Sequence, residues 1–266
     1  MLRGMQRTIA AWRHVSTNTL ALGRRLGDAE WAAPTGCPKW TVGDIFAHHV
    51  GVESWMRDGK GAPDLPVDDF TQRDVDARRD TPRTAVLDEL EEVLRARAEQ
   101  LETADPESIA HTAWGTRTTL ATQMRHRTFD LWVHEQDVRW ALHALRHGPG
   151  PAHTVTDGPA AVLVGRILLA ALPKIVAKDA RAPIGSAVRV SVLGGFDVTV
   201  RVGDDGRASF EEATSEAVAA PTAHVTLSRP EYVRRSAGRD LPSGPVWISG
   251  DRDLGERLVD ALNVAP

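Results

Sequence analysis

The stretch from position 124 to 141, MRHRTFDLWVHEQDVRWA, contains the side chains best suited to chemistry. Arg127, Asp130, His134 and Asp137 follow one another at steps of three, four and three residues, so they share one face of a helix. Asp130 and His134, four residues apart, can bind one metal ion from a single helix. The pattern predicts two ligands of a metal site, and a third must come from elsewhere in the chain.

A second expected helix offers a histidine for this third position. Its start is indicated by Thr41, the expected N-cap, and by Asp44, which completes a capping box. His48 and His49 lie in the middle of this helix, on or near its apolar face, and their spacing does not choose between them. A His, Asp, His set leaves one coordination position open, which is typical of catalytic rather than structural zinc sites.

The remaining residues of the stripe have two interpretations. Asp137 or Arg127 would orient a ligand imidazole or meet an anionic substrate if a metal is bound. In the alternative without a metal, Asp130 forms an ordinary ion pair with Arg127 or His134, and His48 is a hydrogen-bonded histidine of the core. Spacing alone leaves both interpretations open.

Composition narrows the class of protein. The chain has 266 residues, 42% of them hydrophobic and 26% charged, with a net charge of −4, which is the balance of a globular protein without a marked attraction to nucleic acid or anionic membranes. The single cysteine, Cys37, excludes an internal disulfide and favours a reducing compartment. We expect no signal peptide and no apolar run near the roughly 20 residues that span a bilayer. These features predict a cytoplasmic protein.

The helices that must position the stripe belong to the first half of the chain. Apolar periodicity predicts four helices, with irregular connections at 58–80 and 105–115, and together they indicate an antiparallel bundle. The four helices are expected at about 5–27, from Thr41 onward, from Thr81 and Pro82 to about Leu101, and at 119–145. The breakers at 148–151 predict a domain boundary, with domains at 1–150 and 151–266.

The second half shows a different pattern. Residues 158–178 read as a helix, and period-two runs predict strands separated by turn residues. These strands are expected at 187–193, 196–202, 223–227 and 246–248, with helices starting near 228–230 and covering 251–262. The fold class is therefore α + (α+β): a four-helix bundle followed by a small α+β domain with a mainly antiparallel sheet.

Two segments resemble a known family in combination. CPKWTVGDIFAHHVG and HRTFDLWVHEQDVRWAL closely resemble the signature stretches of the mycothiol-dependent maleylpyruvate isomerase family, which belongs to the DinB-like four-helix metalloproteins. The C-terminal half, notably WISGDRDLGERLVDAL, resembles the sterol-carrier-protein-like domain of that family. The resemblance thus covers nearly the whole chain, strongly in two motifs and loosely elsewhere.

The resemblance implies a set of metal ligands. They fall on His48, Asp130 and His134, with His49 as a neighbour. The family pattern has Glu where this chain has Asp130, and because Asp is one methylene shorter, the helices would lie closer or the metal would be held more weakly. The implied cofactors are a divalent metal, Zn²⁺ first, and mycothiol as co-substrate.

Further roles follow from the same implied chemistry. A metal with an open position stabilises a thiolate, which adds to an electrophile for cis–trans isomerisation or S-transfer. Arg239 is the first candidate to bind a substrate carboxylate, with Arg127 and Arg139 as further candidates, and the alternative for Arg239 is an ordinary surface arginine. Trp132 and Arg139 are the candidates for binding the thiol. Cys37 is interpreted as a small packing residue rather than a nucleophile.

The expected partners and the alternatives complete the hypothesis. We expect a small thiol and an electrophilic substrate as partners, no nucleic acid, no membrane, and a monomer or homodimer. Within enzymes, an isomerase and a thiol S-transferase both fit. A different class also fits: a non-catalytic two-domain protein that binds a small molecule or lipid.

Overall fold

The computed structural model describes residues 2–61, 63–148, 150, 154–211, 220–239 and 244–264. The chain divides into two compact units, residues 1–148 with 155–164, and residues 149–154 with 165–266. The predicted boundary at 150/151 stays a prediction, since residues 149 and 151–153 lie outside the described part. The predicted fold class, a helical domain followed by an α+β domain, is confirmed.

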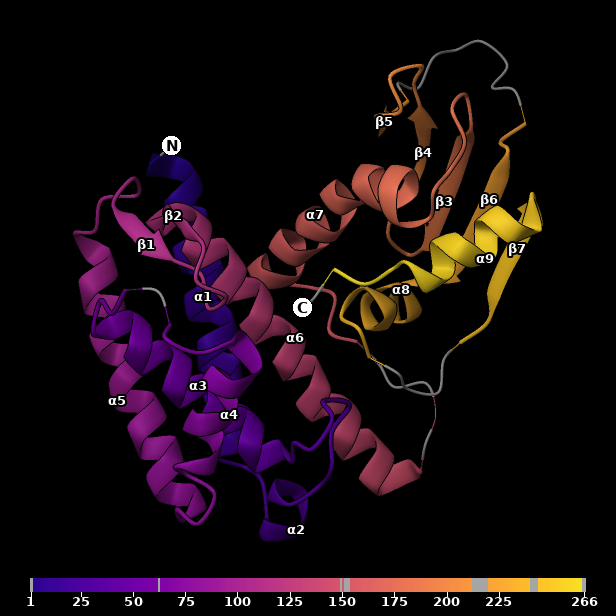
Figure 1. Cartoon of the computed structure of the whole chain (residues 1–266). Coiled ribbons are helices and arrows are strands. Elements are labelled where there is room, and N and C mark those ends of the chain that lie inside the picture. Colours follow the sequence, from indigo (N-terminus) through magenta and orange to yellow (C-terminus); the bar gives the residue numbers. More distant parts are fainter. Residues whose placement is uncertain are drawn as a thin grey trace. The chain divides into compact units, whose positions relative to one another are not determined.

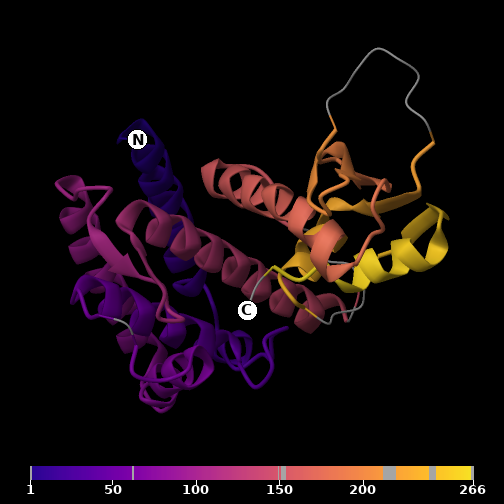
Figure 2. The same cartoon turned by 45° about the horizontal axis from the view of Figure 1, so that its top comes forward.

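Four long helices form most of the first unit (Figure 1). They are α1 (Leu2–Gly23), α3 (Val42–Arg57), α5 (Arg83–Glu102) and α6 (Leu120–His147). Helix α1 packs against α5 and α6, and α3 packs against α5 and α6, as Figures 1 and 2 let the reader follow. Their apolar stripes meet in a core that includes Trp12, Phe46, Leu90 and Leu131. The bundle therefore brings the two segments with candidate ligands, on α3 and α6, into contact.

Two connections that were expected to be irregular contain regular structure. Residues 58–80 include helix α4 (Val67–Asp76), which buries Phe70 and Val75 and carries acidic residues in its first turn, where the helix dipole favours them. Residues 105–115 contribute strand β1 (Ile109–His111), which pairs antiparallel with β2 (Arg117–Thr119). The prediction of loops at both places was wrong because these elements are too short for a clear apolar period. A further short helix, α2 (Asp28–Trp31), precedes α3.

The start of α3 agrees with its predicted cap, and the start of α5 does not. Thr41 Oγ1 accepts a hydrogen bond from Asp44 N at 3.2 Å, while the carboxylate of Asp44 accepts from Thr41 N at 2.8 Å. At α5 the N-cap is Pro82 rather than Thr81, because Pro82 keeps a non-helical backbone with ψ 138° and the helix begins at Arg83. Among the described residues, no side chain caps this helix start. The capping box therefore fixes the first turn of the helix that carries His48.

We expect Thr41→Ala to destabilise the first unit by about 1 kcal/mol, because the N3 amide of α3 loses its acceptor. The measurement is urea denaturation followed by tryptophan fluorescence, which reports mainly on the first unit since all tryptophans except Trp247 lie there. Thr41→Ser is the control, since it keeps the hydroxyl. Equal destabilisation by both substitutions would mean that the methyl group, and not the cap, provides the stability.

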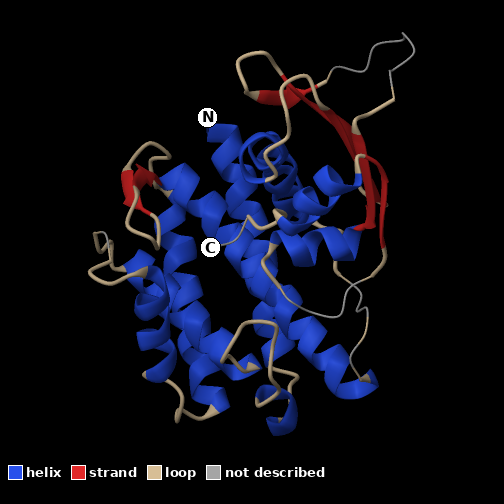
Figure 3. Ribbon diagram, turned by 45° about the vertical axis from the view of Figure 1, so that its right-hand side comes forward, coloured by secondary structure: helices blue, strands red, loops and turns tan. Residues whose placement is uncertain are grey.

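The second unit is built on a five-stranded sheet with the order β5-β4-β3-β6-β7. Strands are drawn in red in Figure 3. Strands β3 and β6 pair in parallel, and the other pairs are antiparallel. The strands are β3 (Ala187–Leu193), β4 (Asp197–Val202), β5 (Ala208–Phe210), β6 (Ala223–Ser228) and β7 (Val246–Gly250). Buried and more exposed residues alternate along β3 and β6, as expected when one face of a sheet is covered.

Helices α8 (Arg229–Ser236) and α9 (Arg252–Asp260) pack against this sheet. Ser228 and Asp251 are their N-caps, and both side chains accept the expected amide hydrogen bonds. A proline lies in the first turn of α8, where it is tolerated because backbone N–H groups there have no acceptor within the helix. The predicted starts of both helices are confirmed.

Helix α7 (Pro159–Lys174) continues into the π-helix η1 (Ile175–Asp179). By length and composition, Pro159–Asp179 is apolar enough to cross a membrane: its most apolar 18-residue window has a mean hydropathy of 2.0, and 39% of that window is buried. The prediction that no run of this kind exists was wrong on this criterion, which core helices of soluble proteins also meet. Within the second unit, which includes α7 from Gly165 onward, Tyr232 of α8 donates a hydrogen bond to Leu168 O at 3.0 Å.

Candidate metal centre

Helices α3 and α6 bring two imidazoles to one carboxylate. His48 Nε2 lies 3.2 Å from Asp130 Oδ2, and His134 Nε2 lies 3.3 Å from Asp130 Oδ1. The two rings lie close together, with centroids 4.9 Å apart. Ligand atoms about 2.0 Å from a tetrahedral zinc ion are about 3.3 Å from one another. The two nitrogen–oxygen distances at Asp130 therefore match the separation between ligands of such an ion.

The other nitrogen of His134 faces a second carboxylate. His134 Nδ1 lies 2.9 Å from Oδ2 of Asp137, which is fully buried. If Nδ1 carries a proton and donates it to Asp137, Nε2 presents a lone pair to an oxygen of Asp130. Such a contact requires a cation, either a proton on Nε2 or a metal ion, and the carboxylate–histidine–metal arrangement of many enzymes has this form. The donor set therefore fits a divalent metal.

The charges around the ligand candidates agree with this interpretation. Burial of the ring lowers the pKa of His48 to about 4, so this imidazole is neutral at pH 7 and has a lone pair available. Burial opposes the charge on His134 as well, but the carboxylates of Asp130 and Asp137 outweigh it and raise the pKa of His134 well above its usual value. Burial likewise opposes ionisation of Asp130, yet His48, His134 and Arg127 hold its pKa well below the ordinary range. A cation is thus favoured between Asp130 and His134.

A buried chain of hydrogen bonds holds Asp130 from behind. Arg127 contacts Asp130 Oδ2 through NH1 and donates through Nε to Glu53 Oε1 at 2.8 Å. Trp12 of α1 donates to the same Glu53 oxygen at 2.9 Å. The side chains of Arg127 and Glu53 are almost completely buried. The chain links α1, α3 and α6, and it fixes the carboxylate that both histidines approach.

One side of this cluster faces solvent. The side chain of Asp130 is 36% exposed, whereas those of His48 and His134 are 5% and 8% exposed. The ring of Trp40 lies beside both histidines, with centroid distances of 5.0 Å to His48 and 5.8 Å to His134. Asp130 is therefore the solvent-accessible member of this group, and the ring of Trp40 lies beside its two histidine partners.

The described part of the chain contains two groups of three potential ligands, and within each group the ligand atoms lie within 4.8 Å of one another. One contains His48, His49 and Asp130, and the other contains Cys37, His134 and Asp137. The contact between Asp130 and His134 connects the two groups. His49 Nδ1 lies 3.2 Å from Arg127 NH2, so this nitrogen accepts from the guanidinium, while the contact of His48 is to Asp130 itself.

The other residues assigned from the sequence have the following surroundings. Arg127 is buried between Glu53 and Asp130. Trp132 is buried, and Arg139 pairs with Glu135 at 2.6 Å. Arg239 belongs to the second unit, where it donates to Ala237 O at 2.6 Å. Their roles in binding thiol or substrate stay predictions.

Glu53 and Cys37 contact residues of the candidate metal centre, but the sequence had not assigned either of them to it. Glu53 is the sole acidic residue in the apolar run 45–56, and this isolation was a usable signal, because a carboxylate inside a core needs a buried partner. Cys37 was interpreted as a packing residue, but its Sγ lies 3.2 Å from Asp137 Oδ2 and 3.7 Å from His134 Nδ1. No sequence pattern indicated this contact, because it joins residues 100 positions apart.

Comparisons with known proteins found a family model that matches part of the first unit and solved structures with a similar overall fold. Residues 12–139 match the family model described as mycothiol maleylpyruvate isomerase N-terminal domain. A crystal structure of a mycothiol-dependent maleylpyruvate isomerase is similar with a TM-score of 0.57 at 15% identity, over 92% of each chain. The structure of a histidine-to-alanine mutant of such an enzyme gives a TM-score of 0.57 at 14% identity with the same coverage. No curated protein sequence matches the chain.

Proposed function

The chain belongs, through residues 12–139, to the mycothiol maleylpyruvate isomerase family, and from this premise we propose that it is a metal-dependent enzyme that activates a small thiol for addition to an electrophile. The family match supports an enzyme. The metal, the thiol and the reaction are the parts that we propose. The observation that supports them most directly is the imidazole of His134, which has a carboxylate oxygen at each of its two nitrogens.

We assign His48, Asp130 and His134 as the residues that hold the cation. Zinc bound by two histidines and a carboxylate would supply an open position at which a thiol is stabilised as its thiolate near neutral pH. Asp137 would keep the proton of His134 on Nδ1, and Arg127 would hold Asp130 in place through its contact with Oδ2. The exposed side of Asp130 is where thiol and electrophile would enter.

Mycothiol is the proposed thiol, and the reaction would be a cis–trans isomerisation of the maleylpyruvate type. The thiolate sulfur would form a bond to one carbon of the cis double bond. The π electron pair of this double bond would move toward the neighbouring carbonyl. Rotation about the new single bond and loss of the same thiolate restore the double bond in the trans form. S-transfer would stop after the addition, with a proton taken up at carbon.

The other assignments belong to this same proposal. Arg239 would bind a carboxylate of the substrate, and Trp132 and Arg139 would contribute to the thiol site. Asp130 replaces the Glu of the family pattern, so its shorter side chain depends more on the support of Arg127. The enzyme would work in the cytoplasm as a monomer or homodimer on small molecules.

We expect protein purified without chelators to bind about one equivalent of zinc and to convert an electrophile in the presence of mycothiol only when the metal is bound. Metal analysis and chelator competition measure the first property, and conversion of a panel of electrophiles with and without mycothiol measures the second. Isomerisation regenerates the thiol, whereas S-transfer consumes it, so product analysis separates the two reactions. Less than a tenth of an equivalent of any divalent metal, with no response to added zinc, would contradict the proposal.

A further inference from the structure

Cys37 occupies a tight loop directly before α3. The loop is closed by a bridge between Pro34 and Thr41, and Trp40 N donates to Cys37 O at 3.1 Å. Thr35 Oγ1 accepts from Cys37 N at 3.1 Å and donates to Trp40 O at 2.9 Å. Side chains of this one loop reach His134 twice, through Cys37 and through the ring of Trp40. The loop therefore determines where the thiol group lies.

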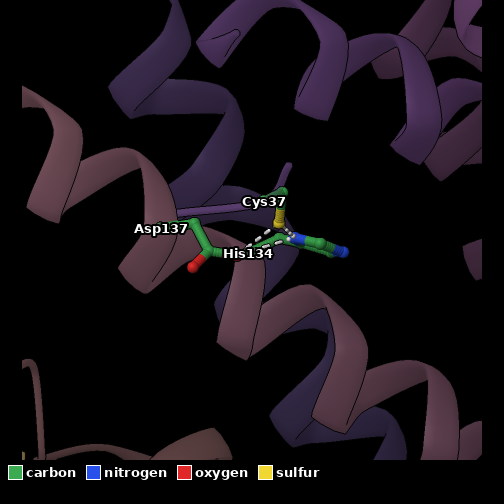
Figure 4. Close-up of side chains that lie close together, drawn as sticks. All are labelled: Cys37, His134 and Asp137. Atoms are coloured by element: carbon green, nitrogen blue, oxygen red, sulfur yellow. Dashed lines mark hydrogen bonds and ion pairs between the residues drawn. The ribbon is translucent and has the colours of Figure 1, made fainter. Parts of the chain in front are cut away.

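The thiol shares its acceptor with the imidazole of His134 (Figure 4). Cys37 Sγ donates to Asp137 Oδ2 at 3.2 Å, and His134 Nδ1 contacts this same oxygen at 2.9 Å. All three side chains are buried. A buried carboxylate is costly unless hydrogen bonds compensate its lost hydration, so each donor to Asp137 helps to keep it in place as an acceptor. Simple packing of Cys37 would not require its sulfur to face the carboxylate.

We propose that Cys37 is a positioning residue for the candidate metal centre: its thiol holds Asp137 so that this carboxylate retains the Nδ1 proton of His134 and leaves Nε2 free to bind a cation. The inference rests on the proposed function, because it specifies how one of the assigned ligands is oriented. It gives the thiol no part as nucleophile or metal ligand. Partners of this kind behind a ligand histidine typically affect metal affinity by about 10–100-fold.

Two other roles for the sulfur lead to different results. As a ligand, Cys37 would bind a cation with His134 and Asp137, since atoms of all three lie within 4.8 Å of one another. As a packing residue, it would contribute volume alone. Replacement by Ser keeps a donor and removes the sulfur, whereas replacement by Ala removes both.

We expect Cys37→Ala to weaken zinc binding on the order of 10-fold and Cys37→Ser to change it by less than about 3-fold, measured by competition with a chromophoric chelator. Ser16→Ala is the control, because it removes a buried hydroxyl from α1 outside this cluster. An unchanged affinity in Cys37→Ala would show that the residue only packs. A cobalt–thiolate charge-transfer band in the Co²⁺-loaded wild type, absent in Cys37→Ser, would show that the sulfur is a ligand. Either result would overturn the proposal.

A measurement on the metal-free protein separates this inference from the proposed function. We expect proton NMR of ¹⁵N-histidine-labelled protein to show a slowly exchanging Nδ1 proton of His134, assigned by its loss in His134→Ala. The signal should persist in Cys37→Ser and exchange at least several-fold faster in Cys37→Ala. If the wild type binds no metal, the proposed function fails, while this comparison still decides what Cys37 does. Equal exchange in wild type and Cys37→Ala contradicts the positioning role.

Discussion

Replacing His134 by Ala should abolish zinc binding at the candidate centre and, with it, thiol-dependent turnover. The ring provides the imidazole nitrogen that faces Asp130 from α6, and its removal also takes away the group that lies between Asp130 and Asp137. We therefore expect a loss of zinc affinity larger than the roughly 10–100-fold that follows loss of a partner behind a ligand. Metal content and chelator competition give the affinity, and mycothiol-dependent conversion of the preferred electrophile gives the activity.

His143→Ala is the matched control, because it makes the same change on the same helix at a residue whose ring contacts His147 instead of the cluster. It should leave zinc content and activity within about twofold of the wild type. Asp137→Asn should give an intermediate result, since it keeps a hydrogen-bonding group but weakens its hold on Nδ1. Full zinc occupancy in His134→Ala would eliminate this residue as a ligand and leave the group of His48, His49 and Asp130 as the alternative.

Replacing Glu53 by Ala should destabilise the first unit by about 3–5 kcal/mol, the cost of breaking a buried ion pair from one side. The substitution leaves the guanidinium of Arg127 without the partner of its Nε, 2.8 Å away, and leaves Arg97 without the carboxylate 3.7 Å from its own Nε. Both arginines are buried, so water cannot replace the lost carboxylate without a rearrangement of the core. Urea denaturation followed by tryptophan fluorescence measures the loss.

Two further variants make this prediction specific. Glu92→Ala, an exposed position on α5, should change stability by less than about 0.5 kcal/mol. Trp12→Phe removes the indole donor to Glu53 and keeps the charge pair, so about 1 kcal/mol is expected. If Glu53→Ala were no more harmful than Trp12→Phe, the arginines would have found other partners, and the buried network would contribute little to stability.

The buried network around Glu53 is linked to the candidate metal centre through Arg127. Arg127 connects Glu53 to Asp130, so a change at Glu53 alters the anchor of a proposed ligand as well as the core. A Glu53→Ala protein should accordingly bind zinc less tightly than Glu92→Ala at a temperature where both are folded. The contact of Arg127 with Asp130 thus helps to hold this short side chain where both histidines approach it.

The sequence alone was sufficient for much of the architecture. Helical periodicity and capping residues located α3, α6, α8 and α9, and alternation located the main strands, because these signals arise from neighbours along the chain. Short elements such as α4 and the β1–β2 pair were missed, since one or two turns of structure give too few periods to recognise. The stripe from Arg127 to Asp137 was likewise visible, because residues three and four apart share a face of any helix.

What only the tertiary structure decided is which groups meet across helices. Spacing could not choose between His48 and His49, and it took the packing of α3 against α6 to bring His48 Nε2 to Asp130 and to turn His49 toward Arg127. The same packing placed Cys37 beside Asp137 and Glu53 beside Arg127, over separations of 100 and 74 residues. Contacts of this kind depend on how two helices are rotated and shifted against each other, and that is set by the whole core rather than by any local pattern.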